Sequence, residues 1–329
     1  MGVIDALSAG FTTAVRRAWL MAIPVALDLF LWLGARLSIE PVVANWVSTL
    51  ESAGVPGNPG LLPEEVKTAL LQWAAQSNLF ALVRTPAALT PTSSAGWLVP
   101  VGEAGLEAPA TWTGFQPAVV EVASLGMVLG LSVLLFLAGL FTSTLYLCLI
   151  AQIVRGEEGA SWLPSWRTIG RTWRRLLIYV LALGLLLAML GVPLSALVAM
   201  ALLTGQSFMA LILNFSLLAF LWVWVWLTIY LLFAVDAIVL NQVGVWAGVW
   251  TSMQVVGRNF WPTVGLFVLS NLIAAGTGVI WGQVAGSPWG VLAGILGNGF
   301  IQTGLIAASL IFFRARYAQL SGAPAADKG

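Results

Sequence analysis

Long apolar runs alternate with shorter polar segments along most of the chain. Six of the runs contain about 20 or more predominantly apolar residues, the length that a helix needs to cross the hydrocarbon core of a bilayer. They cover residues 18–37, 119–154, 176–203, 208–240, 263–284 and 289–313. The pattern predicts an all-α fold, a polytopic transmembrane helical bundle in which residues 1–329 form a single membrane domain.

Residues 38–118, between the first two runs, are predicted to form an extracytoplasmic helical insert. Pro63 and the two glutamates after it are typical of the first turn of a helix. Val66, Leu70 and Trp73 then recur near helical spacing, which is the pattern of an amphipathic helix. We expect this helix to lie on the outer leaflet or to cover the end of the bundle.

Arginine stands next to aromatic residues at the start of three spans, in TAVRRAWLMAIPVAL, RTIGRTWRRLLIYVLAL and QVVGRNFWPTVGLFVL. A guanidinium at the headgroups and an indole at the acyl boundary anchor a helix where it enters the bilayer. The predicted interfacial anchors are Arg17, Trp19, Arg171, Trp173, Arg258 and Trp261. Residues 155–175 and 241–262 are therefore predicted to be cytoplasmic interfacial segments, and the six spans to form three helical hairpins.

The basic residues are distributed unevenly between the two sides of this arrangement. If the N-terminus is cytoplasmic, 11 of the 14 basic residues fall on the cytoplasmic side, and they are Arg16, Arg17, Arg155, Arg167, Arg171, Arg174, Arg175, Arg258, Arg314, Arg316 and Lys328. Arg36, Lys67 and Arg84 fall outside. Because basic residues favour the cytoplasmic side, both termini are predicted there, with residues 314–329 as a cytoplasmic tail.

Composition narrows the function classes. The chain is 60% hydrophobic and 8% charged, against roughly 25% charged residues in soluble domains, so lipid is the expected partner and the bacterial inner membrane the expected location. A net charge of +1 gives no indication of nucleic acid. The chain has no histidine and one cysteine, Cys148, which excludes imidazole catalysis and multi-cysteine metal sites. We predict no catalytic, metal or cofactor-binding residues.

Polar residues inside the apolar runs are the remaining candidates for a site. An acid in lipid is expensive, so it should face the bundle and find a partner. Asp28 lies near mid-span and Asp236 near the cytoplasmic end of its span. The intramembrane amides of the candidate site are Asn214, Asn271, Asn298 and Gln302. These residues either join helices by hydrogen bonds or line a solute path, which requires all of them on facing surfaces.

Glycines recur at four-residue spacing in the last two runs. Gly278, Gly282 and Gly286 precede Gly290 and Gly294. Small residues at this spacing let helices approach closely, so we expect the fifth and sixth spans to form a tight hairpin. The first three glycines also leave open a contact with a second copy of the chain or with another membrane protein.

Residues 232–275 carry a pattern that is similar to a known group of proteins. The segment reads AIVLN, then AGVWTSMQVVGRNFW, then another span. It resembles bacterial six-helix integral membrane families such as the membrane domain associated with glycerophosphoryl diester phosphodiesterases, in which AIVLE is usual where this chain has Asn241. The resemblance implies a membrane architecture. In proteins of that group the phosphodiesterase activity is expected from a separate soluble domain that uses histidine and acidic metal ligands. This chain has no histidine, so the resemblance does not imply the activity.

The sequence favours a non-enzymatic integral membrane scaffold or envelope-associated component. The main alternative is a transporter or permeation subunit that uses Asp28 and the intramembrane polar residues, and a lipid-active membrane enzyme is a third. Obvious broken helices, which mark many transporter sites, are absent from the pattern, and Pro24 and Pro193 are the strong interruptions within the runs.

Overall fold

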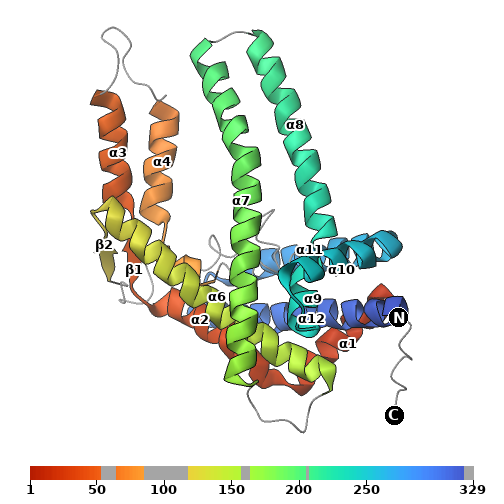
Figure 1. Ribbon diagram of the computed structural model, residues 1–329. Coiled ribbons are helices and arrows are strands. Elements are labelled where there is room, and N and C mark those ends of the chain that lie inside the picture. Colours follow the sequence, from red (N-terminus) through yellow and green to blue (C-terminus); the bar gives the residue numbers. More distant parts are fainter. Residues whose placement is uncertain (53–63, 85–117, 157–163, 205–206, 322–329) are drawn as a thin grey trace.

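The computed structural model describes residues 1–52, 64–84, 118–156, 164–204 and 207–321, which are nearly all helical (Figure 1). The insert 38–118 and the tail 314–329 are therefore described in part. The elements, in chain order, are α1 (Val3–Arg16), η1 (Ala18–Met21), α2 (Ala22–Leu33), β1 (Arg36–Ser38), α3 (Glu40–Ser52), α4 (Glu64–Gln76), η2 (Leu79–Val83), β2 (Val119–Glu121), α6 (Leu125–Arg155), α7 (Trp166–Thr204), α8 (Ser207–Tyr230), α9 (Ala234–Leu240), α10 (Val245–Arg258), α11 (Phe260–Val284) and α12 (Pro288–Ser321).

Five helical segments of the described chain are long and apolar enough to cross a membrane. They are Leu125–Arg155, Trp166–Val198, Leu211–Leu240, Phe260–Val284 and Pro288–Ser321. These segments correspond to the second to sixth predicted spans. The chain is therefore a protein of long apolar helices, as the hydropathy pattern predicts.

The first predicted span, residues 18–37, is shorter in the structure. It consists of the 3₁₀ turn η1 and the 12-residue α2, which together reach about 26 Å at 2.0 and 1.5 Å per residue, against a hydrocarbon core of about 30 Å. Pro24 stands at the third position of α2, where its missing N–H costs little. The chain leaves the helix at Leu33 and becomes extended at Arg36.

The fourth predicted span, residues 208–240, is broken, contrary to the expectation of continuous helices. Three turn residues separate α8 from α9. All seven residues of α9 are buried. Ser252 of α10 bridges the break, because its hydroxyl accepts from the Phe233 N–H at 3.1 Å and donates to the Tyr230 carbonyl at 2.7 Å. If the Phe233 N–H or the Tyr230 carbonyl had no hydrogen-bond partner in an apolar layer, the fold would be destabilised by several kcal/mol.

α12 is the central helix of the bundle. The elements α1, α2, η1, α6, α9, α10 and α11 all pack against it, and α1 lies along it beside the N-terminus (Figure 1). On α1, Ala6, Gly10 and Ala14 are buried at four-residue spacing. A Cβ on Gly10 would lie 2.4 Å from the Gly304 carbonyl oxygen, and a Cβ on Gly304 would lie 2.4 Å from the Phe11 ring. The two backbones therefore approach closely only because both positions are glycine.

α7 packs along α8, and α11 packs along α12 (Figure 1). Trp281 of α11 covers α12 at Gly297, where a Cβ would lie 2.2 Å from the indole. Of the glycines expected in a tight hairpin, Gly290 and Gly294 do lie against α11, since a Cβ on Gly290 would overlap the Val284 carbonyl and one on Gly294 would lie 3.6 Å from Cβ of Trp281. Gly282 and Gly286 do not, since a Cβ on either would meet no neighbouring atom within 4 Å. α2 makes its main contacts with α12, η1 and η2, so the first predicted hairpin, between spans one and two, is not a close helix pair.

Arginines bond backbone carbonyls at the ends of α9 and α6. Arg155 donates to the carbonyl of Leu240, the last residue of α9, at 3.1 Å. Arg314 of α12 donates to the Val154 carbonyl near the end of α6. The last carbonyls of a helix have no intrahelical partner and carry the negative end of its dipole. These side chains therefore stabilise the helix ends on the predicted cytoplasmic side.

Two short strands join the two ends of the insert. β1 pairs with β2 in parallel, with Arg36 opposite Val119 and Leu37 opposite Val120. No strand is expected here from the sequence pattern, which placed Val119 and Val120 in the second predicted span. β-branched residues favour extended backbone, and α6 begins at Leu125. Within the insert, α3 and α4 lie side by side (Figure 1).

Candidate functional site

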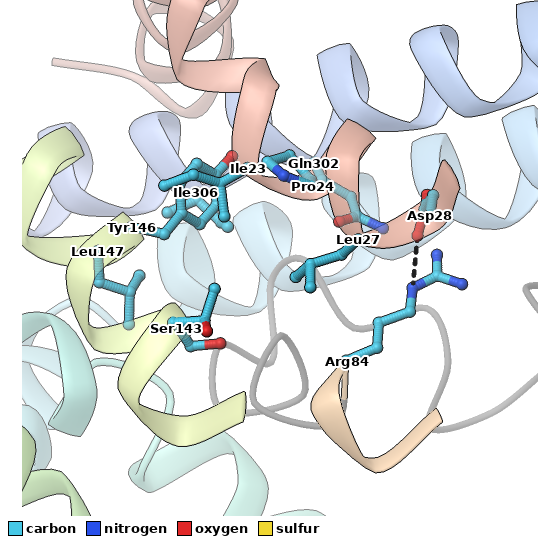
Figure 2. Close-up of a pocket in the computed structure, with 11 residues that line it drawn as sticks. Ile23, Pro24, Leu27, Asp28, Arg84, Ser143, Tyr146, Leu147, Gln302 and Ile306 are labelled. Carbon is cyan, nitrogen blue, oxygen red and sulfur yellow. Dashed lines mark ion pairs between the residues drawn. The ribbon is translucent and has the colours of Figure 1, made fainter. Parts of the chain in front are cut away.

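A cavity of about 30 Å³ lies between α2, α6, α12 and the end of η2. It is lined by Ile23, Pro24, Leu27, Asp28, Arg84, Thr142, Ser143, Tyr146, Leu147, Gln302 and Ile306. Asp28 and Arg84 face each other at one end, and Tyr146, Ser143 and Leu147 lie at the other (Figure 2). A water molecule needs about 10–15 Å³ of such volume, so the cavity has room for about two.

Asp28 is paired with an arginine. The residue as a whole is 2% exposed, and its Oδ1 lies 3.3 Å from Nε of Arg84. Its Oδ2 accepts a hydrogen bond from the Asn298 side chain at 3.2 Å. Both carboxylate oxygens therefore have a donor, which is the condition for a stable buried charge.

Arg84 reaches the cavity because η2 is packed into the bundle. The backbone of Val83 lies against α6 at Gly139, where a Cβ would come within 2.5 Å of the Val83 carbonyl oxygen. Phe80 packs edge-on against Phe30 of α2, with ring centroids 5.2 Å apart. The absence of a side chain at Gly139 therefore allows the approach that brings the guanidinium to its partner.

The start of η2 is tied to the strand pair at the base of the insert. The side-chain oxygen of Asn78 accepts from the N–H groups of Phe80 and Leu37, both at 3.1 Å. Arg36 donates to the Gln76 carbonyl at 2.8 Å. The insert therefore returns to the bundle at a position that is fixed by hydrogen bonds.

The α12 side of the site depends on a close helix crossing. A Cβ on Gly299 would come within 2.8 Å of the Val25 side chain of α2. One turn of α12 around this glycine carries Asn298 and Gln302, and both turn toward α2: Asn298 bonds Asp28, and Gln302 lines the cavity. A larger residue at Gly299 would push α12, and with it both amides, away from the carboxylate.

A buried hydroxyl pair joins α6 to α12 next to the cavity. The Thr303 hydroxyl donates to the Gly299 carbonyl at 2.6 Å and lies 2.6 Å from the Tyr146 hydroxyl. Because Thr303 uses its single proton on the carbonyl, Tyr146 donates to Thr303. Sequence reasoning did not select these residues, since a single tyrosine and a single threonine in apolar helices carry no spacing signal.

Three of the six predicted polar residues neither line the cavity nor bond to Asp28. Asp236 is 1% exposed and accepts a hydrogen bond from Ser309 at 2.5 Å, in the first turn of α9, where the helix dipole favours an acid. Asn214 is exposed on α8. Asn271 donates to the Phe267 carbonyl of its own helix at 2.8 Å. Asp28, Asn298 and Gln302 lie together at the site, and the six residues do not share the single surface that the alternative of a solute path required.

The predicted interfacial anchors lie at or near the surface. Trp19, Arg171, Arg258 and Trp261 are exposed, and Arg17 and Trp173 are half-buried. α10 buries one side against α9 and exposes Trp246 and Trp250 on the other, a feature that sequence reasoning missed. Such rings fit the headgroup level of a bilayer, so the anchoring role stays a prediction.

The chemistry of the site is limited to charge pairing and hydrogen bonding. Within the described ranges no group of three or more His, Cys, Asp or Glu side chains is arranged to hold a metal ion.

Comparisons with protein-family models, with curated proteins and with solved structures gave no match to this chain. The resemblance of residues 232–275 therefore stays a prediction.

Proposed function

We propose that the chain is a non-enzymatic integral membrane scaffold of the bacterial inner membrane, which holds its extracytoplasmic insert in a fixed position on the bundle. The observation that carries the proposal is the bonding of Asp28. Arg84, which the insert supplies, and Asn298 together occupy both of its oxygens in a nearly closed site. An acid that carries protons or ions must exchange its partners, whereas this one joins two parts of the molecule.

The break between α8 and α9 supports the same reading. Discontinuous helices in transporters leave backbone groups free to bind substrate or ions. Here Ser252 bonds both the Tyr230 carbonyl and the Phe233 N–H. The break is therefore stabilised from inside the protein and presents neither of these groups to a solute.

One observation favours a second function, a transporter or permeation subunit. The cavity next to Asp28 is lined by the polar side chains of Thr142, Ser143 and Gln302, and it has room for about two water molecules. A proton or a small ion that reached this cavity would meet the carboxylate. The two functions differ in whether the Asp28–Arg84 pair opens.

Flux measurements on the purified protein in vesicles test the two functions. We expect no protein-dependent proton or lipid flux from the wild type or from Asp28→Asn. Hydrogen exchange in the insert should be faster in Asp28→Asn, because the variant loses the charge that holds Arg84. Asp5→Asn is the matched control, since Asp5 is exposed at the start of α1. A flux that the wild type supports and Asp28→Asn abolishes would establish transport and refute the scaffold.

A further inference from the structure

The insert contains an antiparallel helix pair with two different faces. Lys67, near the start of α4, lies 2.6 Å from Glu51, near the end of α3, so the two helices run in opposite directions. Each helix buries one residue, Val47 on α3 and Ala74 on α4. We take these two positions as the sides on which the helices face each other.

The two tryptophans of the pair lie on the same face. Trp46 and Trp73 each precede the buried residue of their helix by one position, which is a rotation of about 100° in an α-helix. In an antiparallel pair these rotations turn both side chains toward the same side. The exposed fractions, 53% for Trp46 and 59% for Trp73, show that neither indole is covered by the described chain.

The ion pair lies beside the seam between the two helices, on the side away from the tryptophans. Glu51 follows Val47 by four positions and Lys67 precedes Ala74 by seven, which places them about 40° and about 20° from the buried positions, in the direction opposite to the tryptophans. Their hydrogen bond raises the pKa of Lys67 above its usual value. The pair therefore carries its two indoles on one side and its ion pair toward the other, which suits an element at a membrane surface.

The position of the tryptophans identifies what covers them. Trp73 is three residues from Gln76, the end of α4 that leads into η2 and the bundle, and Trp46 is six residues from Glu40, the start of α3 that follows β1. At 1.5 Å per residue both lie within about 9 Å of the base of the pair. The base is fixed to α2 and α6, through the Phe30–Phe80 contact and the packing of Gly139 against Val83. A tryptophan at this distance from membrane-embedded helices meets the interface, where its amphipathic ring is most stable.

We propose that the Trp46–Trp73 face of the α3–α4 pair binds the outer leaflet of the same membrane, at the boundary between headgroups and acyl chains. The occupant is a lipid surface, and the side of the pair toward which Glu51 and Lys67 are displaced is turned to water. This contact does not depend on whether the bundle is a scaffold or a transporter. It fixes the insert on the membrane at a second place besides the Asp28–Arg84 pair.

Site-directed fluorescence on the full chain tests the proposal. Single cysteines carrying an environment-sensitive fluorophore are placed on the two faces in a Cys148→Ala background, in vesicles of phosphatidylethanolamine and phosphatidylglycerol. Trp46→Cys is matched with Ser48→Cys, and Trp73→Cys with Ala75→Cys, because residues two apart on a helix point to nearly opposite sides and both control positions are exposed. Leu70→Cys reports on the tryptophan face with both indoles retained.

We expect the labels at 46, 70 and 73 to be quenched by doxyl-labelled lipid and to be severalfold less quenched by aqueous iodide than those at 48 and 75. Equal iodide quenching at all positions would overturn the proposal, because it would place both faces in water. Protection from iodide without quenching by doxyl lipid would also overturn it, since a polypeptide, such as a second copy of the chain, would then cover the face.

Discussion

Asp28 and Arg84 depend on each other to different degrees. The side chain of Asp28 is 3% exposed and that of Arg84 is 23% exposed. The carboxylate therefore has almost no contact with solvent if its partner is lost, whereas the guanidinium keeps some. Leaving a buried charge without a partner costs more than losing the pair itself.

We predict that Arg84→Met destabilises the protein by about 3–5 kcal/mol, the range for leaving one charge of a buried pair without its partner. Asp28→Asn should cost about 1–3 kcal/mol, because Arg84 remains partly solvated. Denaturant unfolding in detergent micelles gives both values. The double variant should be more stable than Arg84→Met alone, and a double variant as unstable as the sum of the two would show that the residues do not act as a pair.

The sequence predicted this residue-level site only in part. Asp28 could be selected because it is an acid inside an apolar run. Its partner could not be identified, because Arg84 lies 56 residues further along the chain, within the insert, and was one of three basic residues assigned to the outer side. The sequence does contain one signal, because Arg84 directly follows the apolar run LFALV. A cation in this position indicates that the chain comes back to the membrane there.

Among the helices, the long apolar runs predicted six spans, and five of them are helices long and apolar enough to cross a membrane. This part was predictable because length and hydropathy are local properties. The break after Tyr230 was not predictable in the same way. The residues there, YLLFAV, are continuously apolar and contain neither glycine nor proline. The break is stabilised by Ser252, a residue of another helix, so it is a consequence of tertiary packing.

Helix contacts through glycine show how spacing alone can mislead. Gly282 and Gly286 fit a small-residue pattern, yet they face away from other elements. Gly10 and Gly304 form a close contact between α1 and α12, although α1 was not among the predicted spans. The four-residue spacing of Ala6, Gly10 and Ala14 was the signal that could have indicated it.

We predict that Gly10→Leu separates α1 from α12 and lowers the unfolding midpoint, because a side chain at this position would overlap the Gly304 backbone. Overpacking of this kind costs about 1–3 kcal/mol or more. Gly282→Leu is the matched control, because a Cβ at this position would meet no neighbouring atom within 4 Å. Thermal unfolding in micelles compares the two, and equal midpoints would contradict the close contact.

For the whole molecule, the uneven distribution of basic residues predicts that both termini are cytoplasmic. Single cysteines in a Cys148→Ala background test this with a maleimide that does not cross membranes. We expect Ser48→Cys to react in spheroplasts with intact membranes, and Ser8→Cys and Gln319→Cys to react only after permeabilisation. All three positions are exposed. Labelling of Ser8→Cys or Gln319→Cys before permeabilisation would reject the predicted orientation.

The contact between α1 and α12 has a consequence for biosynthesis. α1 leaves the ribosome well before α12, because Gly304 is made almost 300 residues after Gly10, which takes roughly 15 to 60 seconds at about 5–20 residues per second. During that interval the stripe that contains Ala6, Gly10 and Ala14 has no protein to cover it, and an amphipathic helix in this state is stable at a membrane surface. α1 is thus translated long before it can reach its final place, and a chain that stops before α12 leaves it in the lipid interface.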